Sequence, residues 1–141
     1  DNAIKFTWIG HATGVISIGN KVNFIIDPWF TPKRKRYMNA PCQIEDLPFI
    51  NFVLVSHDHY DHCDKNSLIE LENRFKPTFY AGLDSRDVFP KGSKMKEMDW
   101  TQTEIYEIGS EKYKITFVPV CHWSQRKLFD KNKRLWGGFV V

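Results

Sequence analysis

Three histidines and two aspartates stand within six residues, in the segment His57-Asp58-His59-Tyr60-Asp61-His62. Imidazole nitrogens and carboxylate oxygens are ligands of zinc and other divalent metal ions. Side chains two residues apart in an extended segment point to the same side, so His57 and His59 can bind one ion while Asp58 faces away. Asp61 and His62 follow after the chain turns, and they can bind a neighbouring second ion.

A distant fourth histidine, His122, follows the strand-like run that ends at Val120. Three histidines around one ion leave a coordination position open for water, which is typical of a catalytic metal site. Water bound there ionises near pH ~7, and Asp61 is placed to accept or orient its proton, so Asp61 is the candidate catalytic residue. Ordinary surface histidines are the alternative interpretation, and His122 alone, beside Trp123, would more often be packed than ligating.

The elements on either side of the cluster must hold it in place. The apolar run before it predicts a strand over residues 51–56. After it, Asp64 can cap a helix whose apolar positions Leu68, Leu71 and Phe75 lie on one face, and Pro77 ends that helix. The cluster is therefore expected in a loop between a strand and a helix.

The rest of the chain reads mostly as strands. Alternating apolar residues over 4–8 and 22–26, with Gly19-Asn20 before the latter, predict an antiparallel meander. Residues 28–50 contain four prolines and no sustained periodicity, which predicts a long surface loop. A short buried strand is predicted over 78–81, and a hairpin over 103–108 and 113–118. One α/β unit built mostly from antiparallel strands is the simplest account.

Composition narrows the class of protein. The chain has 141 residues, 42% of them hydrophobic, enough for the packed core of one domain. Its net charge of +3 is too small to indicate a nucleic-acid partner, and no apolar run approaches the ~18 residues of a membrane span. Three cysteines without paired spacing favour a reducing compartment, so we expect a cytoplasmic location.

Several further segments strengthen the assignment of the cluster. The chain resembles the metallo-β-lactamase superfamily of metal-dependent hydrolases, and within it the N-acyl-phosphatidylethanolamine phospholipase D group and its bacterial homologues. The segments that carry this resemblance are Trp8-Ile9-Gly10-His11-Ala12-Thr13, Ile26-Asp27-Pro28, Ser56 to His62, His122-Trp123, Asp130, Asn132 and Leu135-Trp136-Gly137-Gly138. The resemblance implies an α/β fold, a four-layered αβ/βα sandwich with the site at one edge of two sheets, and phosphodiester hydrolysis.

The resemblance also implies how the ligands are divided. It makes His57, His59 and His122 ligands of one metal ion, and Asp61 and His62 ligands of another, the two ions being zinc, with iron or manganese as alternatives. A bridging aspartate and a further histidine of the family have no counterpart here. We therefore expect residues 1–141 to be the N-terminal half of the hydrolase domain, completed by a C-terminal half or by a partner chain.

Three further residues are candidates for supporting roles. His11 stands near the site in the resemblance, and we expect either a hydrogen bond to a ligand or a structural role in a turn. Asp27 is expected to accept hydrogen bonds from backbone amides and brace the ligand loop. Arg126 is a candidate for binding a substrate phosphate, because a guanidinium can hold two of its oxygens.

The function predicted from the sequence is a metal-dependent hydrolase, most simply a phosphodiesterase acting on a small-molecule or phospholipid-like anionic substrate. The alternatives are a lactonase or other ester hydrolase of the same fold, and a non-catalytic fragment stabilised by metal or bound at a membrane surface. The basic run Lys33 to Arg36 could make a peripheral contact with an anionic membrane. A solvated loop is the favoured interpretation of that run, because no amphipathic helix frames it.

Overall fold

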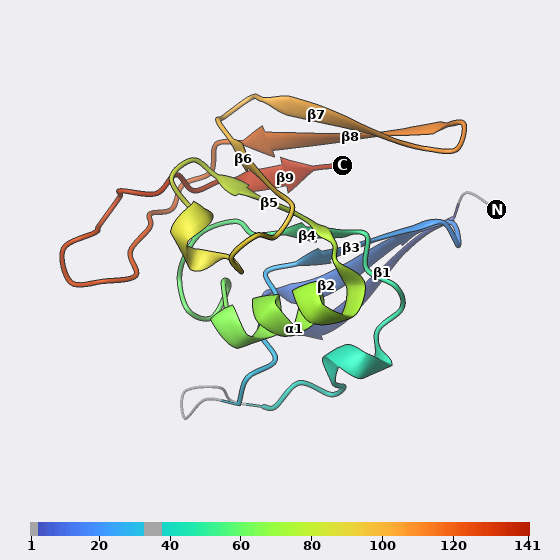
Figure 1. Cartoon of the computed structure of the whole chain (residues 1–141), viewed down its shortest axis with the longest axis horizontal. Coiled ribbons are helices and arrows are strands. Elements are labelled where there is room, and N and C mark those ends of the chain that lie inside the picture. The colour runs from blue at the N-terminus through green and yellow to red at the C-terminus, as the bar shows by residue number, and fades with distance from the viewer. Residues whose placement is uncertain (1–2, 33–37) are drawn as a thin grey trace.

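The computed structural model describes residues 3–32 and 38–141, and in these the strands form two sheets. One sheet has six strands in the order β1-β2-β3-β4-β5-β6, and the other has three in the order β7-β8-β9 (Figure 1). The basic run Lys33 to Arg36, on which the predicted membrane contact depends, lies outside the described residues. No helix in the described ranges is long and apolar enough to cross a membrane.

The chain opens with the predicted antiparallel meander. Its strands are β1 (Ile4–Gly10), β2 (Thr13–Ile18) and β3 (Val22–Ile26). β1 pairs with β2 and β2 with β3, both antiparallel, and the β1–β2 register shifts between Trp8 and Gly10. This irregularity precedes His11, whose φ of 52° lies in the left-handed region that non-glycine residues seldom adopt. The turn therefore sets the direction of the His11 side chain.

The second half of the large sheet is parallel. β4 (Phe52–Leu54) pairs with β3 on one side and with β5 (Thr78–Gly82) on the other, and β5 pairs with β6 (Met95–Met98). The sequence interpretation missed the parallel pairing, because a fully buried run does not reveal the direction of its neighbours. It also missed β6, whose four residues are too few for a clear periodic pattern. Parallel strands end at the same sheet edge, so the segments that follow β3, β4 and β5 lie close together.

A helix was predicted after the ligand loop (residues 55–64), and the structure contains it. α1 (Lys65–Phe75) begins after Asp64, whose carboxylate accepts a hydrogen bond from the backbone amide of Ser67. It ends at Lys76, which has a left-handed φ of 48° and precedes Pro77. Leu68 and Leu71 are fully buried against the large sheet. The helix thus fixes one end of the ligand loop, as the strand β4 fixes the other.

The small sheet covers the face of the large sheet that lies opposite α1 (Figure 1). It consists of the predicted hairpin β7 (Thr103–Ile108) and β8 (Glu111–Val118), with β9 (Gly138–Val140) paired antiparallel to β8. The segment between β8 and β9 is called here the His122 loop (residues 119–137). It begins and ends at neighbouring strands, so it returns to the sheet it left.

Two hydrophobic clusters occupy the two faces of the large sheet, and neighbouring residues in β4 and directly after it point alternately into one cluster and the other. Val53 and Val55 belong to the cluster beneath α1, whereas Phe52 and Leu54 belong to the cluster between the sheets. All four side chains are at most 1% exposed. The ligand loop (residues 55–64) therefore leaves the most deeply buried strand, which gives its first residues little freedom to move.

Residues 28–50 are only partly the surface loop that the sequence predicted. Trp29, Phe30, Ile44 and Ile50 are all buried, and the short 3₁₀ helix η1 (Ile44–Asp46) packs against α1. The sequence pattern did not predict these contacts, because a segment without regular periodicity can still place single apolar side chains in a core. A second 3₁₀ helix, η2 (Arg86–Val88), follows β5.

Candidate functional site

The first group of candidate ligands comes together as predicted. Ligand atoms of His57, His59 and His122 lie within 4.8 Å of one another, although His122 is on a different loop. The ring centroids are 4.5 Å apart for His57 and His59, and 4.1 Å apart for His57 and His122. Such packing of three imidazoles is unfavourable for protonated rings and favourable around a shared cation.

Two nitrogens in this group are buried without a protein partner. They are Nε2 of His57 and Nε2 of His59. Burying an imidazole nitrogen without a hydrogen bond costs free energy, so a buried atom of this kind calls for a ligand that the protein alone does not supply. A divalent metal ion satisfies both nitrogens at once, so the donor atoms present fit such an ion.

The Nδ1 atoms of His57 and His122 are held by neighbouring groups. Nδ1 of His57 and the hydroxyl of Ser56 share a hydrogen bond of 2.8 Å, and Nδ1 of His122 lies 2.9 Å from the carbonyl oxygen of Trp123. A carbonyl can only accept, so Nδ1 of His122 carries a proton, and in the neutral ring this leaves Nε2 with a lone pair for a metal ion. These contacts fix the tautomer and ring direction that metal binding needs.

A second group of candidate ligands lies beside the first. Ligand atoms of His11, Asp61 and His62 lie within 4.8 Å of one another. Nε2 of His11 is 2.8 Å from Oδ2 of Asp61, and Nε2 of His62 is 3.8 Å from the same oxygen. The hydrogen bond predicted for His11 is thus present and links it to Asp61. The rings of His57 and His62 are 4.2 Å apart, which makes the two groups neighbours.

Asp27 braces the ligand loop from beneath, in the manner predicted. Its Oδ1 accepts from the backbone amide of Ser56 at 2.7 Å, and its Oδ2 accepts from the Ser56 hydroxyl at 2.6 Å. The same Oδ2 lies 2.9 Å from Nδ1 of His62. Asp27 is buried and has a left-handed φ of 43° at the end of β3. One carboxylate therefore orients residues of both ligand groups.

The pKa shifts separate two kinds of histidine. Burial and the neighbouring imidazoles lower the pKa of His57 to about 3, and burial is the main cause that lowers the pKa of His59. For His62, burial opposes the charged form, but the hydrogen bond and charge of Asp27 outweigh it and raise the pKa. His57 and His59 are therefore neutral at physiological pH, which is the form that binds metal.

Asp61 keeps its negative charge. Burial favours the neutral acid, but the charge of His62, a backbone hydrogen bond and the contact with His11 together lower its pKa. An ionised carboxylate beside two imidazoles can serve as a metal ligand or accept a proton. The predicted catalytic role of Asp61 remains a proposal that this geometry supports.

Arg126 has a different setting from the one expected of a substrate-binding residue. Its Nη1 donates to the carbonyl oxygens of Asp58 and Cys63, each at 2.8 Å, and its guanidinium stacks 4.5 Å from the ring of Tyr60. The hydroxyl of Tyr60 in turn donates to the carbonyl oxygen of Arg126. Arg126 therefore fastens the His122 loop to the ligand loop, and its contact with a phosphate stays a prediction.

Two residues important for the site were missed by the sequence reasoning. Asp58 and Arg134 are both buried, and Nη1 of Arg134 donates to Oδ2 of Asp58 at 3.1 Å and to Asp130 at 2.7 Å. The other oxygen of Asp58 accepts from the backbone amide of Gln125. The sequence predicted only that the Asp58 side chain points away from the metal. It did not predict that this side chain pairs with Arg134.

The comparisons with known proteins agree with this geometry. Residues 22–141 match the family described as the beta-lactamase superfamily domain, and the chain belongs to that superfamily. N-acyl-phosphatidylethanolamine-hydrolyzing phospholipase D 1 of Caenorhabditis elegans is 32% identical over 157 residues, covering 100% of the chain and 44% of that relative. A metal-dependent hydrolase of Thermodesulfovibrio yellowstonii is 30% identical over 150 residues, covering 99% of the chain and 55% of that relative.

The fold is shared with a solved structure. A metallo hydrolase from the hyperthermophilic archaeon Ignicoccus hospitalis matches with a TM-score of 0.70 and 20% identity, over 97% of the chain and 55% of that protein. The chain thus spans about half the length of the relatives it matches. The predicted fold class is confirmed: a mixed sheet with few helices, as in the N-terminal half of a metallo-β-lactamase-like sandwich.

Proposed function

We propose that this protein belongs to a hydrolase that cleaves phosphodiesters with the help of two divalent metal ions. One observation carries the proposal: imidazoles from two separate loops converge with two buried, unpartnered Nε2 atoms. The family is one of metal-dependent hydrolases, and a relative covering the whole chain is named as a phospholipase D. The phosphodiester is the part of the proposal that this name supports.

Each candidate residue then has a defined task. His57, His59 and His122 would hold one ion, and Asp61 and His62 would take part in holding the other. Bound divalent ions stabilise negative charge on a phosphoryl group and lower the pKa of water. Zinc suits these imidazole and carboxylate donors, as do iron and manganese. Asp61 would orient a nucleophilic water or accept its proton, and His11 would hold the Asp61 carboxylate in place.

The test compares substrates and metal content in the same preparation. The purified protein is loaded with zinc, manganese or ferrous iron, and its hydrolysis of N-acyl-phosphatidylethanolamine and of bis(p-nitrophenyl) phosphate is measured beside that of a lactone. We expect metal-dependent release of phosphate monoester products. His59→Ala should lower turnover by at least about a thousandfold, because the ion and its electrostatic stabilisation are lost.

A matched control excludes a general loss of fold. Glu70→Gln changes an exposed carboxylate on α1 away from the site and should retain full turnover. Faster hydrolysis of the lactone than of either diester would favour an ester hydrolase of the same fold. Turnover that persists in His59→Ala at normal metal content would refute the proposed centre.

A further inference from the structure

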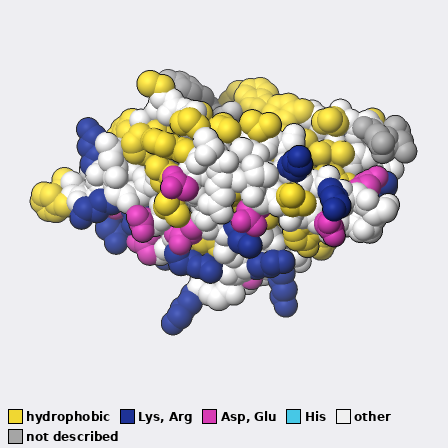
Figure 2. Space-filling model, turned by 90° about the horizontal axis from the view of Figure 1, so that it is seen from above, with side chains coloured by type: hydrophobic (Ala, Val, Ile, Leu, Met, Phe, Trp, Pro, Cys, Tyr) yellow, Lys and Arg dark blue, Asp and Glu magenta, His cyan; other side chains and the backbone are white. Residues whose placement is uncertain are grey.

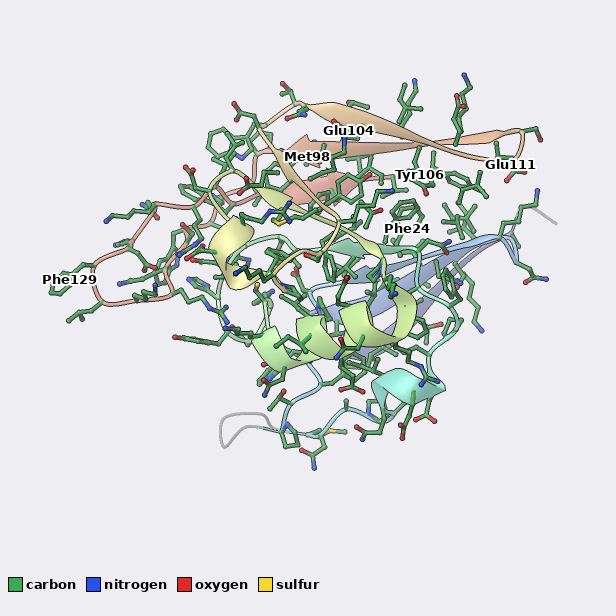
Figure 3. The ribbon with its side chains drawn as sticks, viewed as in Figure 1. Phe24, Met98, Glu104, Tyr106, Glu111 and Phe129 are labelled. Carbon is green, nitrogen blue, oxygen red and sulfur yellow. The ribbon has the colours of Figure 1, made fainter. Side chains whose placement is uncertain are left out.

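The His122 loop carries an apolar tip that no other part of the described chain covers. Leu128 is 79% exposed and Phe129 is 83% exposed, the highest value among the large hydrophobic residues of the described ranges. Figure 3 shows Phe129 at the far end of the loop, pointing away from the body of the protein. Full exposure of two adjacent large apolar side chains costs solvation free energy and needs a reason.

The tip is held in this position by its own loop. Oδ1 of Asp130 accepts from the backbone amides of Arg126 and Lys127, at 2.9 and 2.6 Å. The side-chain amide of Gln125 donates to the carbonyl oxygens of Lys127 and Leu128. Asp130 is buried and also accepts from Arg134. The backbone at the tip is therefore ordered, and the two apolar side chains are presented outward by specific hydrogen bonds.

Positive charge surrounds the tip. Residues 125–134 contain five basic residues and one acidic residue, so this segment carries more net positive charge than the whole chain, at +3. The acidic residue, Asp130, is buried and paired, while Lys127, Lys131 and Lys133 are exposed. Figure 2 shows an apolar projection at one end of the molecule with Lys and Arg side chains beside it.

We propose that Leu128 and Phe129 insert into an anionic lipid surface while the lysines around them bind its headgroups. An apolar tip with a basic collar matches the boundary between acyl chains and negatively charged headgroups. A protein partner would have to bring an acidic apolar surface of its own, whereas an anionic bilayer offers both features in the required order.

A basic residue beside the tip is linked to the candidate metal centre through Trp123, and this part of the inference rests on the proposed function. Nζ of Lys131 lies 5.6 Å from the ring of Trp123, and that ring lies 4.3 Å from the ring of His59. Docking of the tip would therefore bring the site to the lipid surface. The substrate class that fits this placement is a phosphodiester lipid taken from the bilayer.

The experiment measures binding without hydrolysis. Metal-loaded protein is sedimented with vesicles of phosphatidylcholine alone and of phosphatidylcholine with phosphatidylserine. We expect binding only to the mixed vesicles and weakening at high salt. Leu128→Ser with Phe129→Ser should reduce affinity by about tenfold or more, and Lys127→Gln, Lys131→Gln and Lys133→Gln by about fivefold each.

The matched control replaces exposed apolar residues elsewhere. Ile4→Ser with Ile105→Ser changes side chains that are 73% and 56% exposed on β1 and β7, and vesicle binding should be unchanged. Equal loss in the control, or binding by the tip variant at the original affinity, overturns the proposal. So does self-association, measured by analytical ultracentrifugation, that disappears in the tip variant while vesicle binding persists.

The same variants separate this proposal from the proposed function. The tip variant should hydrolyse water-soluble bis(p-nitrophenyl) phosphate at the original rate but lose turnover on lipid in vesicles. If vesicle binding fails while soluble diester is still cleaved, the lipid surface is refuted and the hydrolase is not. If vesicle binding is lost in the tip variant but the original protein cleaves no diester, the hydrolase is refuted and the lipid surface is not.

Discussion

Arg134 and Asp58 form a buried ion pair, with Nη1 of the arginine 3.1 Å from Oδ2 of the aspartate and side chains that are 8% and 1% exposed. Asp58 stands between His57 and His59, and Arg134 lies on the loop that carries His122. The pair therefore joins the two segments that must meet to form the first ligand group. The pair thereby positions the candidate metal ligands although neither of its side chains is itself a proposed ligand.

Removing one partner of this pair should be strongly destabilising. Asp58→Ala leaves part of the charge of buried Arg134 uncompensated, and we expect a loss of about 3–5 kcal/mol in the free energy of unfolding, measured with urea. Lys112→Ala, which breaks the exposed pair with Glu107, is the control and should cost at most about 1 kcal/mol. Asp58→Ala combined with Arg134→Ala should cost less than the sum of the two single variants, and strictly additive losses would contradict the pairing.

Asp27 should affect metal binding although it is not one of the proposed ligands. Asp27→Asn weakens the contact with Nδ1 of His62 and the hydrogen bonds to Ser56. We expect metal affinity to fall about 10-fold to 100-fold, as for other groups that orient a ligand, with the drop seen by competition with a chelating dye. Unchanged affinity in a folded Asp27→Asn protein would show that His62 needs no orienting partner.

Removing the metal should lower thermal stability. An ion bound only by the folded state stabilises it by about 4 kcal/mol when its free concentration is a thousand times its dissociation constant. Unfolding followed by circular dichroism should therefore shift to lower temperature after chelation, and return on adding zinc. His122→Ala removes a proposed ligand of one ion only, so the chelator should lower its melting temperature by less than in the original protein; a chelator effect of full size in that variant would place the ion elsewhere.

The pair of Asp87 and Arg134 should make stability depend on acid. The hydrogen bonds from Arg134 lower the pKa of Asp87 below its value in the unfolded chain. The stabilisation is thus fully present above the unfolded pKa of about 3.9, and is lost as the pH falls through and below it. The free energies of unfolding of the original protein and of Asp87→Asn, measured with urea, should differ at about pH 6 and converge as the pH falls below about 3.9. Asp84→Asn, a neighbouring carboxylate without this contact, should show no such convergence.

The local parts of the site could be predicted from the sequence. His57 and His59 follow a buried strand, and Asp64 caps the next helix, so residue types and spacing along one short segment determined the ligand loop. The proximity of His122 followed from the chemistry of metal ions, since a catalytic ion needs ligands from more than one segment. Both inferences depended on rules that act over a few residues or on the demands of one ion.

The remaining features depend on contacts that no local pattern contains. Arg134 meets Asp58 across 76 positions of the chain, and His11 meets Asp61 across 50. The parallel order of β3, β4 and β5 brings those segments to one edge, and sheet order is set by the packing of the whole domain. The same holds for Ile44 and Ile50, which fill the core from a segment without periodicity.

The alternation of His57, Asp58 and His59 limits how this protein can vary in length. Because consecutive side chains there point to opposite sides, a single inserted residue before His57 would turn both imidazoles toward Arg134 and aim the carboxylate at the neighbouring histidines. An insertion beside Phe129, at a solvent-facing tip, would leave every one of those directions intact. Natural variants and engineered loops should therefore tolerate added residues at the far end of the His122 loop and reject them beside the strand β4.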